Sequence, residues 1–85
     1  MSTKFFTVAM VNESTNDYMI TTIIQTKQRD FRADVTTPDG ECAHVTQDEL
    51  TFSGEWKLRM FADADYQKSR TQARNWASVY VTGVP

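Results

Sequence analysis

Alternation of apolar and polar residues is the clearest pattern along the chain, and it predicts β-strands. Trp56, Leu58 and Met60 alternate with charged residues in the segment Trp56–Ala62. Because successive side chains of a strand point to opposite faces, this spacing gives one apolar face and one polar face. The segment Phe31–Thr36 has the same two-residue period. We therefore expect two strands here, each with one face against a core.

Further apolar or β-branched segments are also expected to form strands; they are Phe5–Val11, Tyr18–Gln25, Glu41–Thr46 and Leu50–Phe52. Tyr18–Gln25 carries apolar residues at both odd and even positions, which predicts a strand covered on both faces. The polar residues 12–17 predict a loop. Pro38 and Gly40 stand where a β-turn favours them, so residues 37–40 are expected to close a hairpin.

Residues 63–81 leave two alternatives open. As a helix, they place five residues at helical spacing, with Asp63 or Asp65 as the cap; the five are Tyr66, Ala73, Trp76, Ala77 and Tyr80. As a hairpin, the chain turns through residues 63–69 and returns along Gln72–Val81. The β-branched and aromatic content of Ser78–Thr82 favours the strand.

Composition favours the same conclusion. Thr, Val, Ile, Phe, Tyr and Trp fill 32 of the 85 positions, whereas Leu occurs twice. We expect one domain over residues 1–85, an all-β fold of six or seven strands arranged as a small Ig-like antiparallel β-sandwich. The alternative is an α+β fold with a C-terminal helix at about 63–80. No apolar run is long enough to span a membrane, and one cysteine excludes a disulfide scaffold.

Charge is divided unevenly along the chain. Residues 1–65 carry six basic and eleven acidic groups, whereas residues 66–85 carry three basic groups and no acidic one. The basic C-terminal segment also contains Tyr66, Trp76 and Tyr80. Three positive charges make few phosphate contacts, so we expect this segment to face an acidic protein partner rather than nucleic acid.

Candidate catalytic and metal-binding residues are few. Cys42 and His44 lie on one face of the expected strand, but a nucleophile–base pair needs a separate orienting group. We interpret them as a small buried cysteine and an ordinary histidine. Paired cysteine spacing, an EF-hand glycine and a glycine-rich phosphate loop are all missing from the sequence. We therefore predict no catalytic residue, metal, cofactor or small-molecule substrate, and no enzyme.

Phe61 interrupts the pattern of its strand, because it falls on the polar face with Lys57 and Arg59. An exposed aromatic residue beside arginine has the composition of a binding hot spot. Together with the basic and aromatic residues of the C-terminal segment, these residues form the expected partner surface. That surface comprises Lys57, Arg59, Phe61, Tyr66, Arg70, Arg74, Trp76 and Tyr80.

Three segments carry a resemblance to a known family. Ala33–Gly40 is a strand entering a Pro-Asp-Gly turn, Leu50–Leu58 contains Gly54-Glu55-Trp56 at the start of a strand, and Ser78–Val81 would close the module. Phe31–Val81 thereby resembles the small Ig-like β-sandwich modules of tailed-bacteriophage virions. The resemblance implies a non-enzymatic capsid decoration, neck or tail component in a multi-copy assembly with other virion proteins.

Such a protein would be made in the host cytoplasm and then reside in the virion. Residues 1–6 lack the apolar stretch of a signal peptide, and we expect no membrane partner. The alternative function is a small acidic phage-encoded inhibitor that binds a host enzyme or nuclease complex. A helix over residues 63–81 would favour this alternative.

Overall fold

The structure, a computed structural model, describes residues 4–26, 32–46 and 49–83. It contains six strands followed by one helix within those residues: β1 Lys4–Asn12, β2 Asp17–Thr26, β3 Arg32–Thr36, β4 Cys42–Thr46, β5 Leu50–Ser53, β6 Trp56–Asp63 and α1 Tyr66–Thr82. The six strand predictions between residues 5 and 62 are confirmed, with bounds that differ by at most one residue; Phe31, the first residue of one predicted strand, lies outside the described residues. The β-rich prediction is therefore right, and of the two alternatives for the C-terminal segment the helix is the correct one.

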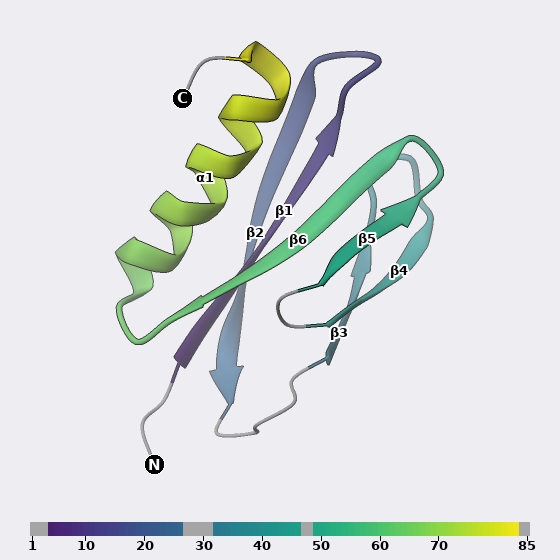
Figure 1. The fold of residues 1–85 in the computed structure, drawn as a ribbon. Helices are drawn as coiled ribbons and strands as arrows, with labels where there is room; N and C mark the ends of the chain where they lie inside the picture. The colour runs from purple at the N-terminus through teal and green to yellow at the C-terminus, as the bar shows by residue number, and fades with distance from the viewer. Residues whose placement is uncertain (1–3, 27–31, 47–48, 84–85) are drawn as a thin grey trace.

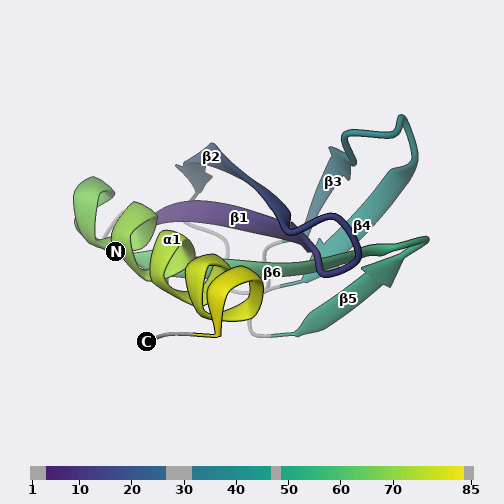
Figure 2. The ribbon, with the colours of Figure 1, turned by 90° about the horizontal axis from the view of Figure 1, so that it is seen from above.

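Four strands form an antiparallel sheet in the order β2-β1-β6-β5, and β3 pairs with β4 as a separate hairpin. The helix α1 lies on one face of the sheet and the β3–β4 hairpin lies on the other (Figures 1 and 2). The domain thus has three layers, with the four-stranded sheet in the middle.

The two outer layers are offset from one another. α1 packs on β2, β1 and β6, whereas β4 packs on β5 and β6. Viewed from above, the helix and the hairpin lie toward opposite ends of the sheet (Figure 2). Among the described residues, each edge strand consequently has an exposed part: the α1 face of β5, and the hairpin face of β2 at Met19, whereas Ile23 further along β2 packs on the core beneath the hairpin.

β1 is one of the two interior strands of the sheet, and it is buried on both faces. Phe6, Val8 and Met10 belong to the core between the sheet and the hairpin, which also contains Trp56, Leu58 and Met60. Ala9 and Val11 point the other way and pack against Ala73 and Ala77 of α1. The hairpin contributes Ala33, Val35, Ala43 and Val45 to the first core, as its two-residue period predicts.

The prediction of a closing strand at Ser78–Val81 is wrong, since these residues form the last turns of α1. The side chain of Asp65 accepts hydrogen bonds from the backbone N–H groups of Gln67 and Lys68, which starts the helix. Small residues four apart, namely Ser69, Ala73 and Ala77, form its buried stripe. Such small side chains let the helix lie close to the sheet, and this burial outweighs the strand preference of the last residues.

The prediction that Tyr18–Gln25 is covered on both faces holds only in part, since Ile20 packs on the core beneath α1 and Ile23 packs on the core beneath the hairpin, whereas the first residues of β2 are exposed. Tyr18 is 44% exposed on the α1 face and Met19 is 45% exposed on the hairpin face, because both lie at the first end of an edge strand of the sheet. Ile20 alone of the first four β2 residues packs into the core beneath α1. The side chains of residues 24–26, at the end of β2, lie outside the described set.

Candidate protein-interaction surface

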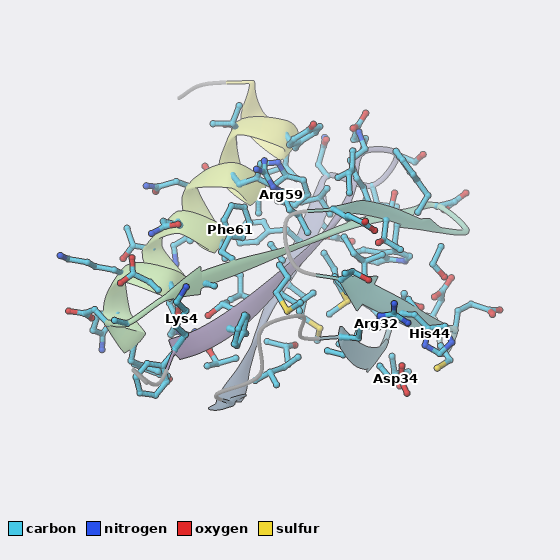
Figure 3. The ribbon with its side chains drawn as sticks, turned by 60° about the horizontal axis from the view of Figure 1, so that its bottom comes forward. Lys4, Arg32, Asp34, His44, Arg59 and Phe61 are labelled. Atoms are coloured by element: carbon cyan, nitrogen blue, oxygen red, sulfur yellow. The ribbon has the colours of Figure 1, made fainter. Side chains whose placement is uncertain are left out.

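Lys57, Arg59 and Phe61 share the α1 face of β6, because they alternate with the core residues of that strand. Phe61 is half-buried, so the prediction of a solvent-facing aromatic residue needs correction: α1 covers the face that the sequence suggested was open. The Phe61 ring lies 5.9 Å from the Trp76 ring, and the Trp76 ring lies 4.8 Å from that of Tyr80. Figure 3 shows Arg59 and Phe61 on the side of β6 where α1 lies.

The two cations of this face lie over aromatic rings. Lys57 Nζ is 4.3 Å from the Tyr80 ring centroid and 5.7 Å from that of Phe52. The guanidinium carbon of Arg59 is 5.0 Å from the centroid of Phe61. These are cation–π distances, and they hold the long side chains flat along the surface.

β5 extends this surface beyond the helix. In the β5–β6 register Leu50 lies beside Arg59 and Phe52 lies beside Lys57, so both point to the α1 face. Because α1 does not pack on β5, Leu50 is 44% exposed and Phe52 is 66% exposed. We refer to the whole set as the basic–aromatic surface: Leu50, Phe52, Lys57, Arg59, Phe61, Trp76 and Tyr80.

The remaining three residues of the predicted partner surface lie elsewhere. The Tyr66 ring is 5.7 Å from Phe5 at the start of β1, and Arg70 Nη1 donates a 2.6 Å hydrogen bond to Thr22 Oγ1 of β2. Arg74 is exposed one helical turn after Arg70, on the same flank. The predicted set therefore divides into five residues beside β6 and three beside β2 and β1.

Sequence reasoning missed Leu50 and Phe52. Their exposure follows from the position of β5 at the sheet edge and from the offset of α1, neither of which a single strand reveals. The two-residue spacing of Leu50 and Phe52 was the available signal, since it predicts one apolar face.

A pocket of about 290 Å³ adjoins the basic–aromatic surface at the end where β1 turns into β2 and β5 turns into β6. Phe52 and Lys57 line it together with Glu13 and Glu55. Lys57 Nζ also contacts Glu13 Oε1 at 2.5 Å, so the positive charge beside the pocket is partly compensated. The pocket is large enough for one side chain of a binding partner.

Cys42 and His44 lie on the exposed face of the hairpin, so the expectation of a buried cysteine is wrong. His44 Nδ1 contacts Asp34 Oδ1 across the β3–β4 ladder, which supplies the orienting carboxylate that the sequence did not reveal. The side chains of His44 and Asp34 are 78% and 70% exposed. Figure 3 shows both on the hairpin, away from Arg59 and Phe61.

Over residues 4–26, 32–46 and 49–83, no group of three His, Cys, Asp or Glu side chains is placed to hold a metal ion. In the same part of the chain, the helix is too short and too polar to cross a membrane. Comparison with known proteins gives no match: no family model, no curated protein and no solved structure is similar to the chain.

Proposed function

We propose that this chain is a protein-binding domain that acts by contact with another protein chain and not by turnover of a substrate. The observation that carries the proposal is the basic–aromatic surface, where exposed Leu50 and Phe52 continue a row of Lys57, Arg59 and packed aromatic rings. Aromatic residues and arginine are the side chains that contribute most to binding energy at protein interfaces.

The chemistry of this surface defines its partner. A partner needs an apolar segment to cover Leu50 and Phe52, and acidic or neutral groups near Arg59. The exposed edge of β5 adds backbone N–H and C=O groups that pair with an extended strand. A structural role among other copies or other virion proteins remains our proposal for where such binding is used. The Ig-like resemblance supports it through Phe31–Leu58 alone, because Ser78–Val81 is helical.

The inhibitor of a host enzyme or nuclease complex is a second candidate, favoured by α1 and by an acidic end of the molecule. The turns after β1, β3 and β5 lie at one end (Figure 1) and carry Glu13, Asp17, Asp39, Glu41 and Glu55, all exposed. Asn12 Nδ2 lies 3.4 Å from Glu55 Oε2, which joins two of these turns. An acidic end of this kind complements the basic channel of a nucleic-acid enzyme.

Photo-crosslinking tests the protein-binding proposal. A benzophenone amino acid placed at Phe52 is expected to give a discrete protein adduct under illumination in cells that contain the partner. The same group at Thr36, exposed on β3, is the matched control. Equal adduct yields at the two positions would refute the proposal.

Charge reversal separates the two candidates. Arg59→Glu is expected to reduce the adduct if the basic–aromatic surface binds the partner, whereas Glu55→Lys reduces binding if the acidic end does. Both side chains are exposed, so neither change disturbs the core.

A further inference from the structure

Four of the seven large apolar side chains that are exposed among the described residues lie on the two edge strands of the sheet, and the other three lie on α1. Tyr18 and Met19 on β2 and Leu50 and Phe52 on β5 are each more than two-fifths exposed. Neither β2 nor β5 contains the Lys, Arg or Pro with which proteins commonly protect sheet edges. Both edges are therefore open to pairing with another strand.

The directions of the strands make the two edges compatible with each other. Each neighbouring pair in the order β2-β1-β6-β5 is antiparallel, so β2 and β5 also run in opposite directions. A second copy that continues the sheet with the same face upward thus places its β5 antiparallel beside β2. Leu50 and Phe52 of that copy then lie on the same face as Tyr18 and Ile20, because all four point to the α1 face.

The offset of the outer layers makes this arrangement complementary in shape as well. The neighbour's Leu50 and Phe52 come to lie beside the end of the sheet that α1 covers, next to Ile20 and Val81. On the other face, Met19 comes to lie beside the end of the neighbour's sheet that its hairpin covers. The same contact therefore covers the exposed α1 face of β5 and the exposed hairpin face of β2 at Met19.

A two-fold dimer does not achieve this. Pairing β5 with β5 joins two edge strands on which α1 does not pack. Pairing β2 with β2 joins two edge strands on which the hairpin does not pack. A stable interface buries roughly 1,200 Å² or more in total. A four-residue strand such as β5 gives too little contact alone, so the added contacts with helix and hairpin decide in favour of the head-to-tail arrangement.

We propose that the partner of the basic–aromatic surface is a second copy of this chain, bound head to tail with its β2 edge on β5. This proposal rests on the proposed function, since it names the partner of that surface. Each strand-to-strand step rotates a sheet by about 20–25°, so successive copies of four strands form a twisted ribbon. Such heterologous contacts extend until a ring closes or a filament grows.

Sedimentation velocity with edge variants tests the arrangement. In the proposed contact, Asp17 at the start of β2 and Glu55 after β5 of the next copy lie at the same end of the paired strands. The assays are therefore run at high ionic strength, which screens the repulsion between the two carboxylates. The unmodified chain is expected to form species larger than a dimer as its concentration rises. Phe52→Lys blocks β5 and Met19→Lys blocks β2, so each variant alone is expected to be monomeric. Their mixture is expected to form a one-to-one dimer, because each supplies the intact edge that the other lacks.

The controls keep the outcomes distinct. Thr36→Lys, on the exposed face of β3, should assemble like the unmodified chain. Circular dichroism verifies folding, and Leu50→Lys and Tyr18→Lys replace any variant that does not fold. Self-association of the Met19→Lys variant alone would overturn the head-to-tail arrangement in favour of a β5 two-fold. A chain that stays monomeric at every concentration would overturn self-association, whereas a Phe52 adduct with a different protein would leave the proposed function standing.

Discussion

The interface between α1 and the sheet contains a buried pair of hydroxyl groups whose removal has a calculable cost. Thr7 of β1 and Ser69 of α1 are both fully buried, and their Oγ atoms lie 2.8 Å apart. Ser69 Oγ donates to the backbone carbonyl of Tyr66, which leaves it to accept the proton of Thr7. Every proton of the pair is therefore used.

The two hydroxyl groups differ in what their removal leaves behind: without the Thr7 hydroxyl, Ser69 Oγ still donates to the Tyr66 carbonyl, whereas without the Ser69 hydroxyl the buried Thr7 donor has no acceptor. Thr7→Val keeps the side-chain volume and is expected to lower the free energy of unfolding by about 1 kcal/mol. Ser69→Ala strands the buried donor of Thr7, at a cost of about 1–3 kcal/mol that is offset by about 0.5 kcal/mol of helix propensity. The double variant has no unpaired group, and we expect its stability to lie within about 0.5 kcal/mol of that of the unmodified chain.

Urea unfolding followed by circular dichroism measures the four free energies of this cycle. In a domain of this size, a loss of 1 kcal/mol also lowers the Tm by roughly 4–8 °C, which gives an independent check. Thr71→Val is the control, because the Thr71 hydroxyl bonds to the Gln67 carbonyl on the exposed side of α1. If the double variant loses the sum of the two single losses, the hydroxyl groups do not act as a pair and the reasoning is refuted.

Further predictions concern the ends of α1 and the core. Asp65→Ala should lower the free energy of unfolding by about 1 kcal/mol, whereas Asp65→Asn should retain most of it; equal losses would show that the cap is unimportant. Gly83 has φ +71°, so Gly83→Ala should cost about 1 kcal/mol and Gly83→Asn less, and an unchanged urea midpoint for the alanine variant would contradict the assigned conformation. Leu58→Ala, at a fully buried site, should cost about 2–5 kcal/mol in the same assay, and a loss below 1 kcal/mol would argue against a packed hairpin layer.

The strands were predictable from sequence because a two-residue period is local to each of them. Ala33 and Val35 show this directly, since both are buried while their neighbours in the strand are exposed. α1 was harder, because its buried residues are Ser69, Ala73 and Ala77, whose small side chains give a weak apolar period. The β-branched residues in its last turns then outweighed that signal.

The candidate surface was predictable in part. Lys57, Arg59, Trp76 and Tyr80 were expected to act together, and the structure places them side by side. Arg70 was not separable from them by sequence, because only the orientation of α1 on the sheet directs it toward β2. The exposure of Phe52 depends on where two distant segments lie, which is information that no local pattern contains.

The two tryptophans report on different layers of the molecule. Trp56 is 7% exposed in the core beneath the hairpin, whereas Trp76, a residue of α1, is half-buried beside Phe61 where the helix packs on the sheet. Removal of one indole therefore leaves a fluorescence signal that follows a single layer. Trp76→Phe would show when the hairpin detaches, and Trp56→Phe would show when the helix does. The fold contains its own pair of optical probes for whether the two sides of the sheet unfold together or in sequence.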